Sequence, residues 1–512
     1  MTEGFIVLDF GSQYTQLIAR RLRELDVYSE LMLFNTPLEK IKEMKPKGII
    51  LSGGPASVFD TESPTVDVKP LMEIAPVLGI CYGMQLMAHQ LGGQVSPAER
   101  REYGSALIHW KQPPIKGHPS PQKVWMSHGD MVEALPQGFE LWASSEGGIP
   151  AAIRSDRAWG FQFHPEVTHS DHGIDLLKTF VFDLCKAEPH WKAEWIADHL
   201  MGEIQKQVGD KDHVLCALSG GVDSTVVGTL LTRALGHDRV HCVFVDTGLL
   251  RKGEFEQVQS SYETLGLNVL AVDARQYFYD RLKGVSEPEQ KRKIIGASFI
   301  DIFKKEIKIV EKECGHVDWL AQGTLYPDVI ESVSPRGTSV TIKSHHNVGG
   351  LPKDLNLKLV EPLRELFKDE VRELGANLGI PHQMLWRHPF PGPGLAIRIM
   401  GEVTPEDVKI LQEADSIYVE SLKRAGLYDQ IWQAFCVLLP VKTVGVQGDS
   451  RTYDKVVALR AVTSRDGMTA DWFDFPPTFL REVSNRITNE VRGVNRVVYD
   501  VTSKPPGTIE WE

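Results

Sequence analysis

The sequence lacks several features that would assign it to a specialised class of protein. Its 512 residues contain no apolar run long enough to span a membrane, and residues 1–4 do not begin the basic-then-apolar pattern of a signal peptide. Its six cysteines include no Cys-x-x-Cys pair, which disfavours a zinc site or a disulfide framework and is typical of a reducing compartment. These absences predict a soluble, cytoplasmic protein without a membrane partner.

Positive charge is also scarce. Lys and Arg together number 56 against 68 Asp and Glu, so the formal net charge is −12. An acidic total argues against a surface that coats nucleic acid, although it permits one local basic pocket. With 42% hydrophobic and 24% charged residues, the composition is that of a globular protein, and the length predicts about three domains.

The glycine-rich stretch Ser219-Gly220-Gly221-Val222-Asp223-Ser224 carries the strongest functional signal. It follows the apolar run 214–218 and precedes the helix-like segment 225–235. Glycines let the backbone approach a ligand, and free N–H groups at a helix N-terminus favour an anion. Asp223 is out of place beside an anion unless a divalent cation lies between them, which predicts Mg²⁺.

A bare Ser-Gly-Gly is more often an ordinary capped turn, and 52–54 repeats it without the Asp-Ser ending. The complete hexapeptide between strand and helix favours a phosphate site, and it lacks the Gly-Lys-Ser/Thr of a Walker loop. It resembles the pyrophosphate loop of the N-type ATP pyrophosphatases, which adenylate a carbonyl oxygen and release pyrophosphate. That resemblance implies ATP bound by Ser219, Gly220, Gly221, Val222, Asp223, Ser224 and Thr225.

Residues 1–190 alternate short apolar runs with amphipathic stretches, which predicts a parallel α/β sheet. The strand-like run 76–80 leads into Gly79-Ile80-Cys81-Tyr82-Gly83, and a helical segment follows. Gly-x-Cys-x-Gly in this position is typical of a nucleophile elbow, in which we expect the glycines to permit the sharp turn. A lone cysteine is more often buried and structural, but the glycine bracket favours Cys81 as a nucleophile.

A cysteine nucleophile needs a base and a group that orients the base. His164 follows the strand-like run 159–163, and Glu166 lies two residues further on. Residues i and i+2 of an extended chain point to the same side, so Glu166 can orient His164. His128 is the competing base, and His164 is preferred because its carboxylate partner is adjacent.

In this order, Cys81, His164 and Glu166 resemble the triad of the class I glutamine amidotransferases, over about the first 190 residues. The resemblance implies that Cys81 attacks the side-chain amide of glutamine, forms a thioester and releases ammonia. It also implies backbone oxyanion donors at Gly54 and Tyr82, and a substrate contact from Gln85. Exposed N–H groups aimed at a developing oxyanion agree with that assignment.

Residues 191–387 predict a second doubly wound sheet, because apolar runs alternate with helical segments. Such sheets bind ligands at the carboxyl ends of their strands, where 219–224, 246–248 and 322–324 fall. The glycine-hinged stretch 335–354 is interpreted as a loop that closes on substrate. Its adjacent histidines, His345 and His346, point apart and have no third ligand at a suitable spacing, so a metal site is less favoured.

Residues 388–512 predict a compact α+β unit. The preceding Pro- and Gly-rich stretch 387–394 is interpreted as a linker or a shaped binding loop. Exposed-looking Val and Tyr strands are suitable for a homodimer interface, although a monomeric domain explains the pattern nearly as well. The tail 504–512 is expected to fray by default.

The stretches 322–328 and 343–352 are similar to the glutamine-hydrolysing GMP synthetase family, and the resemblance extends over essentially the whole chain. In that family the C-terminal tail closes on the nucleotide substrate. By this resemblance, xanthosine monophosphate (XMP) is bound by Arg292, Arg398, Gln447, Lys504 and Glu510.

The overall expectation is an α/β protein with two doubly wound parallel-sheet domains, 1–190 and 191–387, and a smaller α+β C-terminal domain, 388–512. The resemblance implies that ATP adenylates the C2 oxygen of XMP, and that ammonia from glutamine displaces AMP to give GMP. We expect no nucleic-acid partner, and we expect the protein to form a homodimer.

Three alternatives are weaker. Another glutamine-dependent ligase, such as NAD or asparagine synthetase, is disfavoured by the order of the cysteine elbow and phosphate loop and by the C-terminal unit. A tRNA-thiolating or RNA-binding protein is disfavoured by the acidic charge and the missing cysteine pairs. A non-catalytic regulatory relative is disfavoured because nucleophile, base and phosphate loop are all intact.

Overall fold

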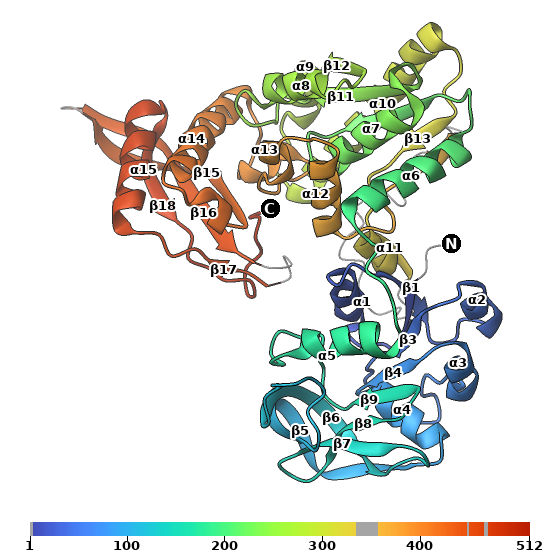
Figure 1. The fold of residues 1–512 in the computed structure, drawn as a ribbon. Coiled ribbons are helices and arrows are strands. Elements are labelled where there is room, and N and C mark those ends of the chain that lie inside the picture. The colour runs from blue at the N-terminus through green and yellow to red at the C-terminus, as the bar shows by residue number, and fades with distance from the viewer. Residues whose placement is uncertain (1–3, 334–356, 448–449, 465–468) are drawn as a thin grey trace. The chain divides into compact units, whose positions relative to one another are not determined.

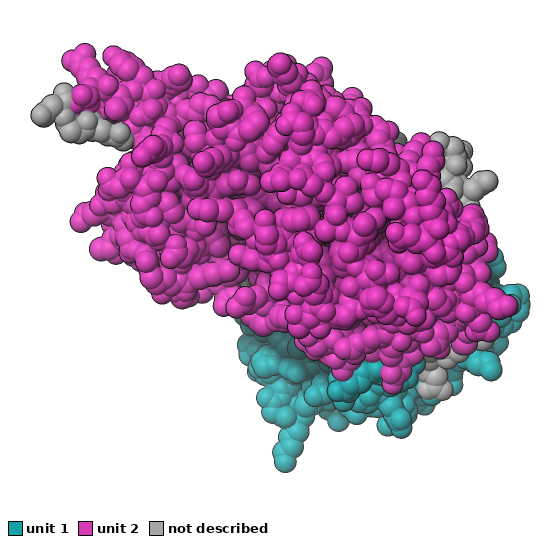
Figure 2. All heavy atoms as spheres, turned by 90° about the horizontal axis from the view of Figure 1, so that it is seen from above, with its two compact units in different colours: residues 1–195 teal, residues 196–512 magenta. Residues whose placement is uncertain are grey.

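A computed structural model describes residues 4–333, 357–447, 450–464 and 469–512 of the chain (Figure 1). The chain divides into two compact units, residues 1–195 and 196–512 (Figure 2). The predicted closing loop at 335–354 lies outside the described residues. Within the described ranges, no helix combines the length and the apolar character needed to cross a lipid bilayer.

The described part of the first unit is built on one nine-stranded mixed sheet. One part is parallel, in the order β2 (Tyr28–Leu33), β1 (Gly4–Asp9), β3 (Gly48–Leu51), β4 (Val77–Ile80) and β9 (Ala158–Phe161). The sheet continues through antiparallel strands β8 (Pro150–Arg154), β7 (Glu140–Ser145), β5 (Gln94–Trp110) and β6 (Gln122–Ala134). The predicted parallel α/β sheet is therefore confirmed for the first part, whereas the antiparallel extension departs from it.

Short helices follow the parallel strands of this unit: α1 (Thr15–Arg23), α2 (Leu38–Glu43), α3 (Val68–Ile74), α4 (Tyr82–Gln90) and α5 (Gly173–Thr179). Strands β3 and β4 are buried along their whole length, as expected when helices cover both faces of a parallel sheet. The loops that follow these two strands leave the same edge of the sheet. This topology brings residues 52–54 next to Cys81.

The second unit contains a parallel sheet in the order β12 (Val269–Asp273), β11 (Val240–Asp246), β10 (Val214–Leu218), β13 (Trp319–Ala321) and β14 (Lys358–Val360). The strand order reverses direction between β10 and β13, and in doubly wound sheets this is where a ligand crevice opens. The helices of this part are α6 (Ala193–Val208), α7 (Val222–Leu235), α8 (Glu254–Thr264), α9 (Arg275–Leu282), α10 (Pro288–Cys314), α11 (Tyr326–Val333), α12 (Lys368–Asn377) and α13 (His382–Leu385).

The last part of the chain is the predicted α+β arrangement. Its sheet contains the hairpin of β15 (Gln433–Gln447) and β16 (Ser450–Thr463), and β16 also pairs with β17 (Asp471–Trp472) and β18 (Val494–Tyr499). Helices α14 (Pro405–Arg424) and α15 (Pro477–Glu490) pack together beside this sheet (Figure 1). One apolar core joins this part to the β10–β14 sheet, since Leu215 and Val245 belong to the same buried cluster as Leu411 and Val457.

The Pro- and Gly-rich stretch 387–394 is anchored to this core through His388. The imidazole is buried, stacks on Tyr428 with ring centroids 3.8 Å apart, donates from Nε2 to the Tyr428 carbonyl at 2.9 Å, and accepts at Nδ1 from the Ala434 N–H at 3.1 Å. Burial lowers the pKa of His388 to about 4. Of the two interpretations offered for this stretch, a shaped loop therefore describes it better than a linker.

Candidate active sites

Cys81 occupies a strained turn between β4 and α4. Its backbone has φ +51° and ψ −107°, a combination that is unfavourable for any residue except glycine and that is found mainly at functional sites. The Cys81 N–H donates to the Phe161 carbonyl at 2.7 Å, which fixes the turn to the neighbouring strand β9. The predicted elbow is present.

The flanking glycines serve a different purpose from the one expected. Neither Gly79 nor Gly83 has a positive φ, so the strain lies in Cys81 itself. A Cβ on Gly83 would lie 2.3 Å from the Leu51 carbonyl oxygen, and one on Gly79 would lie 2.6 Å from the Gly83 carbonyl. The glycines therefore allow α4 to pack directly against β3 and β4, and this close packing holds the turn in place.

His164 and Glu166 complete a buried cluster with Cys81. The His164 Nδ1 and the Glu166 Oε1 are 2.7 Å apart, and all three residues are at most 4% exposed. Burial by itself lowers the pKa of His164, but the Glu166 carboxylate and hydrogen bonds with Cys81 and Glu166 raise it well above its ordinary value. The geometry thus brings together the three side chains that the sequence grouped.

The competing histidine, His128, is engaged elsewhere. It lies on β6, where its Nδ1 is 2.9 Å from the Asp130 carbonyl and its Nε2 is 3.2 Å from the Glu102 carboxylate. Burial lowers the pKa of His128. Its ring therefore stabilises the antiparallel strands, and the hydrogen bond to Cys81 comes from His164.

One predicted oxyanion donor, Gly54, belongs to the loop beside Cys81, and the other, Tyr82, directly follows Cys81 in the chain. A Cβ on Gly53 would lie 3.1 Å from His164 and 3.6 Å from Cys81, so the 52–54 loop lies directly beside Cys81. Among the described residues, the N–H groups of Gly54 and Tyr82 donate to no acceptor, as an oxyanion hole requires. Gln85 is buried and donates to the Asp130 carbonyl at 2.9 Å and to Gln162 at 3.2 Å, so it positions β6.

A second candidate site is formed by the loop between β10 and α7. Gly220 has φ +73°, and the backbone N–H groups of Val222, Asp223 and Ser224 occupy the first helical turn, where intrahelical acceptors are lacking. The hydroxyls of Ser219 and Ser224 lie 3.0 Å apart at the open side of the loop. These groups form a cradle of donors suited to an anion.

Two of the predicted loop residues face inward. The Thr225 hydroxyl donates to the Gly221 carbonyl at 2.7 Å and lies 3.2 Å from the buried Tyr262 hydroxyl, and Val222 is 7% exposed. Their side chains therefore support the loop from below. A contact with a ligand from Val222 would have to come from its backbone N–H.

Two cations that the sequence patterns did not single out hold this loop. Lys368, at the start of α12, donates to both carboxylate oxygens of Asp223 at 2.5 Å. Arg387 donates to the Gly220 carbonyl at 2.5 Å and also to Glu254. Because these residues follow Asp223 by 145 positions or more, no local spacing in the sequence could reveal the contacts.

The C-terminal tail is packed rather than frayed. The fully buried Arg398 donates to the Glu510 carboxylate at 2.8 and 3.1 Å, and Arg292 donates to the main-chain oxygen of Glu512. Lys504 pairs through its backbone with Ala470. Three of the five predicted XMP residues, Arg292, Arg398 and Glu510, are thus engaged in contacts between the tail and the unit, whereas the Gln447 side chain lies outside the described atoms.

Three family models match the chain in succession: glutamine amidotransferase class-I over residues 6–184, NAD synthase over 193–294, and GMP synthase C terminal domain over 420–511. Proteins named GMP synthase [glutamine-hydrolyzing] match along their full length. The one from Bdellovibrio bacteriovorus is 64% identical, covering 99% of this chain and 100% of that protein. The one from Aquifex aeolicus is 56% identical, covering 99% of this chain and 99% of that protein. The one from Lactobacillus acidophilus is 55% identical, covering 100% of this chain and 98% of that protein.

This chain belongs to the glutamine-hydrolysing GMP synthase family. The NAD synthase match is confined to residues 193–294, which include the phosphate loop. The C-terminal model and the full-length relatives cover the rest of the chain, so NAD synthetase is not favoured. The recognition made from the sequence motifs is confirmed.

The packing role of Gly83 leads to a prediction. Gly83→Ala places a methyl group against the Leu51 carbonyl, so we expect a loss of about 1–3 kcal/mol in the stability of the first unit. Denaturant unfolding followed by tryptophan fluorescence measures it. Gly147→Ala is the matched control, because the nearest atom to its added methyl would be 3.6 Å away. Equal stability of the two variants would contradict the close-packing role.

Proposed function

We propose that this chain synthesises GMP from XMP, ATP and glutamine. Membership of the family carries the proposal, since relatives at 55–64% identity over their whole length are named for this activity. The two candidate sites support it, because one has the groups for glutamine hydrolysis and the other has a cradle for a nucleotide's phosphates. We assign glutamine hydrolysis to residues 1–190, ATP chemistry to 191–387, and XMP binding with dimerisation to 388–512.

In the first site, Cys81 is proposed as the nucleophile. Its sulfur attacks the side-chain amide carbon of glutamine, and the N–H groups of Gly54 and Tyr82 stabilise the oxyanion that forms. His164 takes up the thiol proton and returns it to the departing nitrogen, which leaves as ammonia. Water then hydrolyses the thioester to glutamate. Glu166 holds the His164 ring at 2.7 Å and favours its protonated form.

In the second site, the loop 219–225 is proposed to hold the phosphates of ATP. The C2 oxygen of XMP attacks the α-phosphorus, so that pyrophosphate leaves and AMP remains on the purine. Ammonia then adds at C2 and AMP departs, which gives GMP. Adenylation is needed because an oxygen bound to a purine carbon is a poor leaving group until it carries a phosphoryl substituent. Serine hydroxyls and first-turn N–H groups supply the donors for the departing pyrophosphate.

The loop also fits the proposed Mg²⁺. Mg²⁺ in nucleotide sites usually takes one or two carboxylates and completes its shell with phosphate oxygens and water. Asp223 offers a hard, partly exposed carboxylate at the mouth of the cradle, now neutralised by Lys368. When bound, the ion would neutralise charge on the phosphates, while Lys368 would be released to contact the same anion.

For XMP, we propose the residues taken from the family resemblance: Arg292, Arg398, Gln447, Lys504 and Glu510. Arg398 and Glu510 form an ion pair between the β10–β18 unit and the tail, so we propose that they act together and hold the tail as one wall of the nucleotide site. Cytoplasmic location is proposed as well, and it is supported by six cysteines that are all unpaired.

The proposed nucleophile gives a direct test. With Cys81→Ala, we expect glutamine-dependent GMP formation to fall by a factor of about 10³ or more, whereas synthesis supplied with ammonium should be kept. XMP-dependent release of pyrophosphate from ATP should also remain, and this assay defines the function. Loss of both nitrogen sources would show that Cys81 is misassigned, and release of ADP and orthophosphate instead would overturn the adenylation chemistry.

The proposed metal ligand gives a second test. Asp223→Ala should lower XMP-dependent pyrophosphate release by on the order of 10²–10³, with little effect on stability because the pair with Lys368 is partly exposed. Asp238→Ala, which removes an exposed carboxylate from the same unit, is the matched control. Unchanged pyrophosphate release at limiting Mg²⁺ would exclude the role given to Asp223.

The homodimer is proposed from an exposed apolar surface on the β15–β16 hairpin. Val441, Val444, Val446 and Tyr453 are 53–75% exposed there, and clustered apolar side chains of this kind mark interaction sites. We expect the protein to sediment as a dimer and the double variant Val444→Lys, Val446→Lys to sediment as a monomer. Leu107→Lys, on the first unit, is the control. A wild-type monomer at micromolar concentration would refute the proposal.

A further inference from the structure

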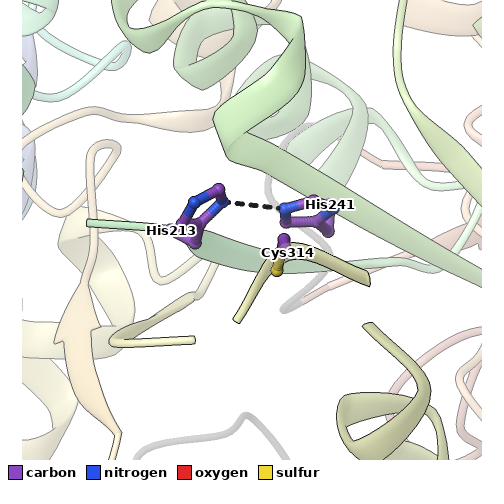
Figure 3. A group of neighbouring side chains, drawn as sticks. All are labelled: His213, His241 and Cys314. Carbon is purple, nitrogen blue, oxygen red and sulfur yellow. Dashed lines mark hydrogen bonds between the residues drawn. The ribbon is translucent and has the colours of Figure 1, made fainter. Parts of the chain in front are cut away.

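His213, His241 and Cys314 lie next to one another in the second unit (Figure 3). They lie near the amino ends of β10 and β11, whereas the phosphate loop follows the carboxyl end of β10. His213 immediately precedes β10, His241 is the second residue of β11, and Cys314 is the last residue of α10. The amino ends of parallel strands lie at the other edge from their carboxyl ends, so this cluster is separate from the proposed ATP site.

The spacing of the ligand atoms is close to that of a metal centre. The His213 Nδ1 and the His241 Nε2 are 3.0 Å apart, and these atoms and the Cys314 sulfur all lie within 4.8 Å of one another. Two nitrogens bound to a tetrahedral Zn²⁺ are separated by about 3.3 Å, given Zn–N bonds of about 2.0–2.1 Å. A small widening of the histidine pair, with approach of the sulfur, therefore gives three ligands.

The protonation chemistry also permits binding. At present one proton lies between the two imidazoles, and the Asn268 amide is 3.4 Å from the His241 Nδ1. When a cation binds between the two rings, that proton moves to the Nδ1 of His241. The Asn268 amide rotates so that its oxygen accepts the proton there. The Cys314 thiol gives up its proton to solvent, so one proton is released for each ion bound.

Carboxylates near the cluster add negative potential. Glu313 acts electrostatically on His241, and the Asp318 carboxylate accepts from the His213 backbone N–H at 3.3 Å. The nearby His316 is 73% exposed and is directed to Glu311 and Asp318 instead. It therefore provides a matched histidine outside the set of ligands.

We propose that His213, His241 and Cys314 bind one zinc-class transition-metal ion, with water at the fourth position. Two imidazoles and a thiolate suit Zn²⁺ and exclude Mg²⁺, which takes oxygen ligands. The ion ties the C-terminus of α10 to two strands of the sheet, and it stabilises the second unit because it binds only the folded chain. The absence of a Cys-x-x-Cys pair disfavoured zinc in the sequence analysis. No short motif could have revealed these ligands, because His213 and Cys314 are 101 residues apart.

Titration with Co²⁺ tests the proposal. Tag-free, chelator-treated protein in buffer without Mg²⁺ or nucleotide should bind one equivalent, with a thiolate-to-cobalt charge-transfer band that Zn²⁺ bleaches on displacement. Cys314→Ser should lose the band, and His213→Gln and His241→Gln should weaken Co²⁺ binding at least tenfold. His316→Gln should bind as the wild type does. Zn²⁺ should raise the unfolding temperature of the wild type but not that of Cys314→Ser.

Each opposite result counts against the site. No charge-transfer band, a band that survives Cys314→Ser, or equal affinity in both histidine variants and the wild type would overturn it. Circular dichroism of the variants shows whether they fold. If Cys314→Ser does not fold, the two histidine variants decide, because their side chains are partly exposed and glutamine preserves one hydrogen-bonding group. These outcomes are independent of the proposed function, since no substrate is present.

Discussion

Both candidate active sites depend on one constraint, the abrupt passage of a buried parallel strand into a helix. At β4–α4 the passage forces Cys81 to φ +51° and aims its sulfur at His164. At β10–α7 it leaves first-turn N–H groups open beside Gly220. The same backbone geometry therefore presents the candidate nucleophile in one unit and the candidate anion cradle in the other.

Basic side chains from distant parts of the sequence then hold the phosphate loop and the C-terminal tail in place. Arg387 and Lys368 reach the phosphate loop from residues far along the chain, and Arg398 holds the tail through Glu510. Arg460 is fully buried as well and donates to the carbonyls of Thr502 and Thr508. These contacts explain how a tail rich in proline, with no helix or strand beyond residue 499, is nonetheless packed against the unit.

The sequence was most informative where chemistry is local. The elbow at Cys81, the pairing of His164 with Glu166, and the loop 219–224 each depend on residues close in the chain, and each was found. It was least informative about the antiparallel strands β5 to β8, which continue the parallel sheet; β6, for example, alternates buried and more exposed residues and forms no continuous apolar run. Lys368 and Arg387 were missed because only the topology brings them to the loop. The purpose of Gly83 was misjudged for the same reason, since its neighbour Leu51 belongs to another strand.

The continuous core of the second unit has a consequence for how this molecule can be divided. Leu215 and Val245 of the β10–β14 sheet share one apolar cluster with Leu411 and Val457 of the C-terminal part. A chain cut near residue 387 would expose a large apolar surface on both halves to water. The free-energy cost grows with the apolar area exposed. The predicted boundary at residue 387 therefore does not separate independently folding pieces, and an exchange of domains across it would have to include the matching half of the core.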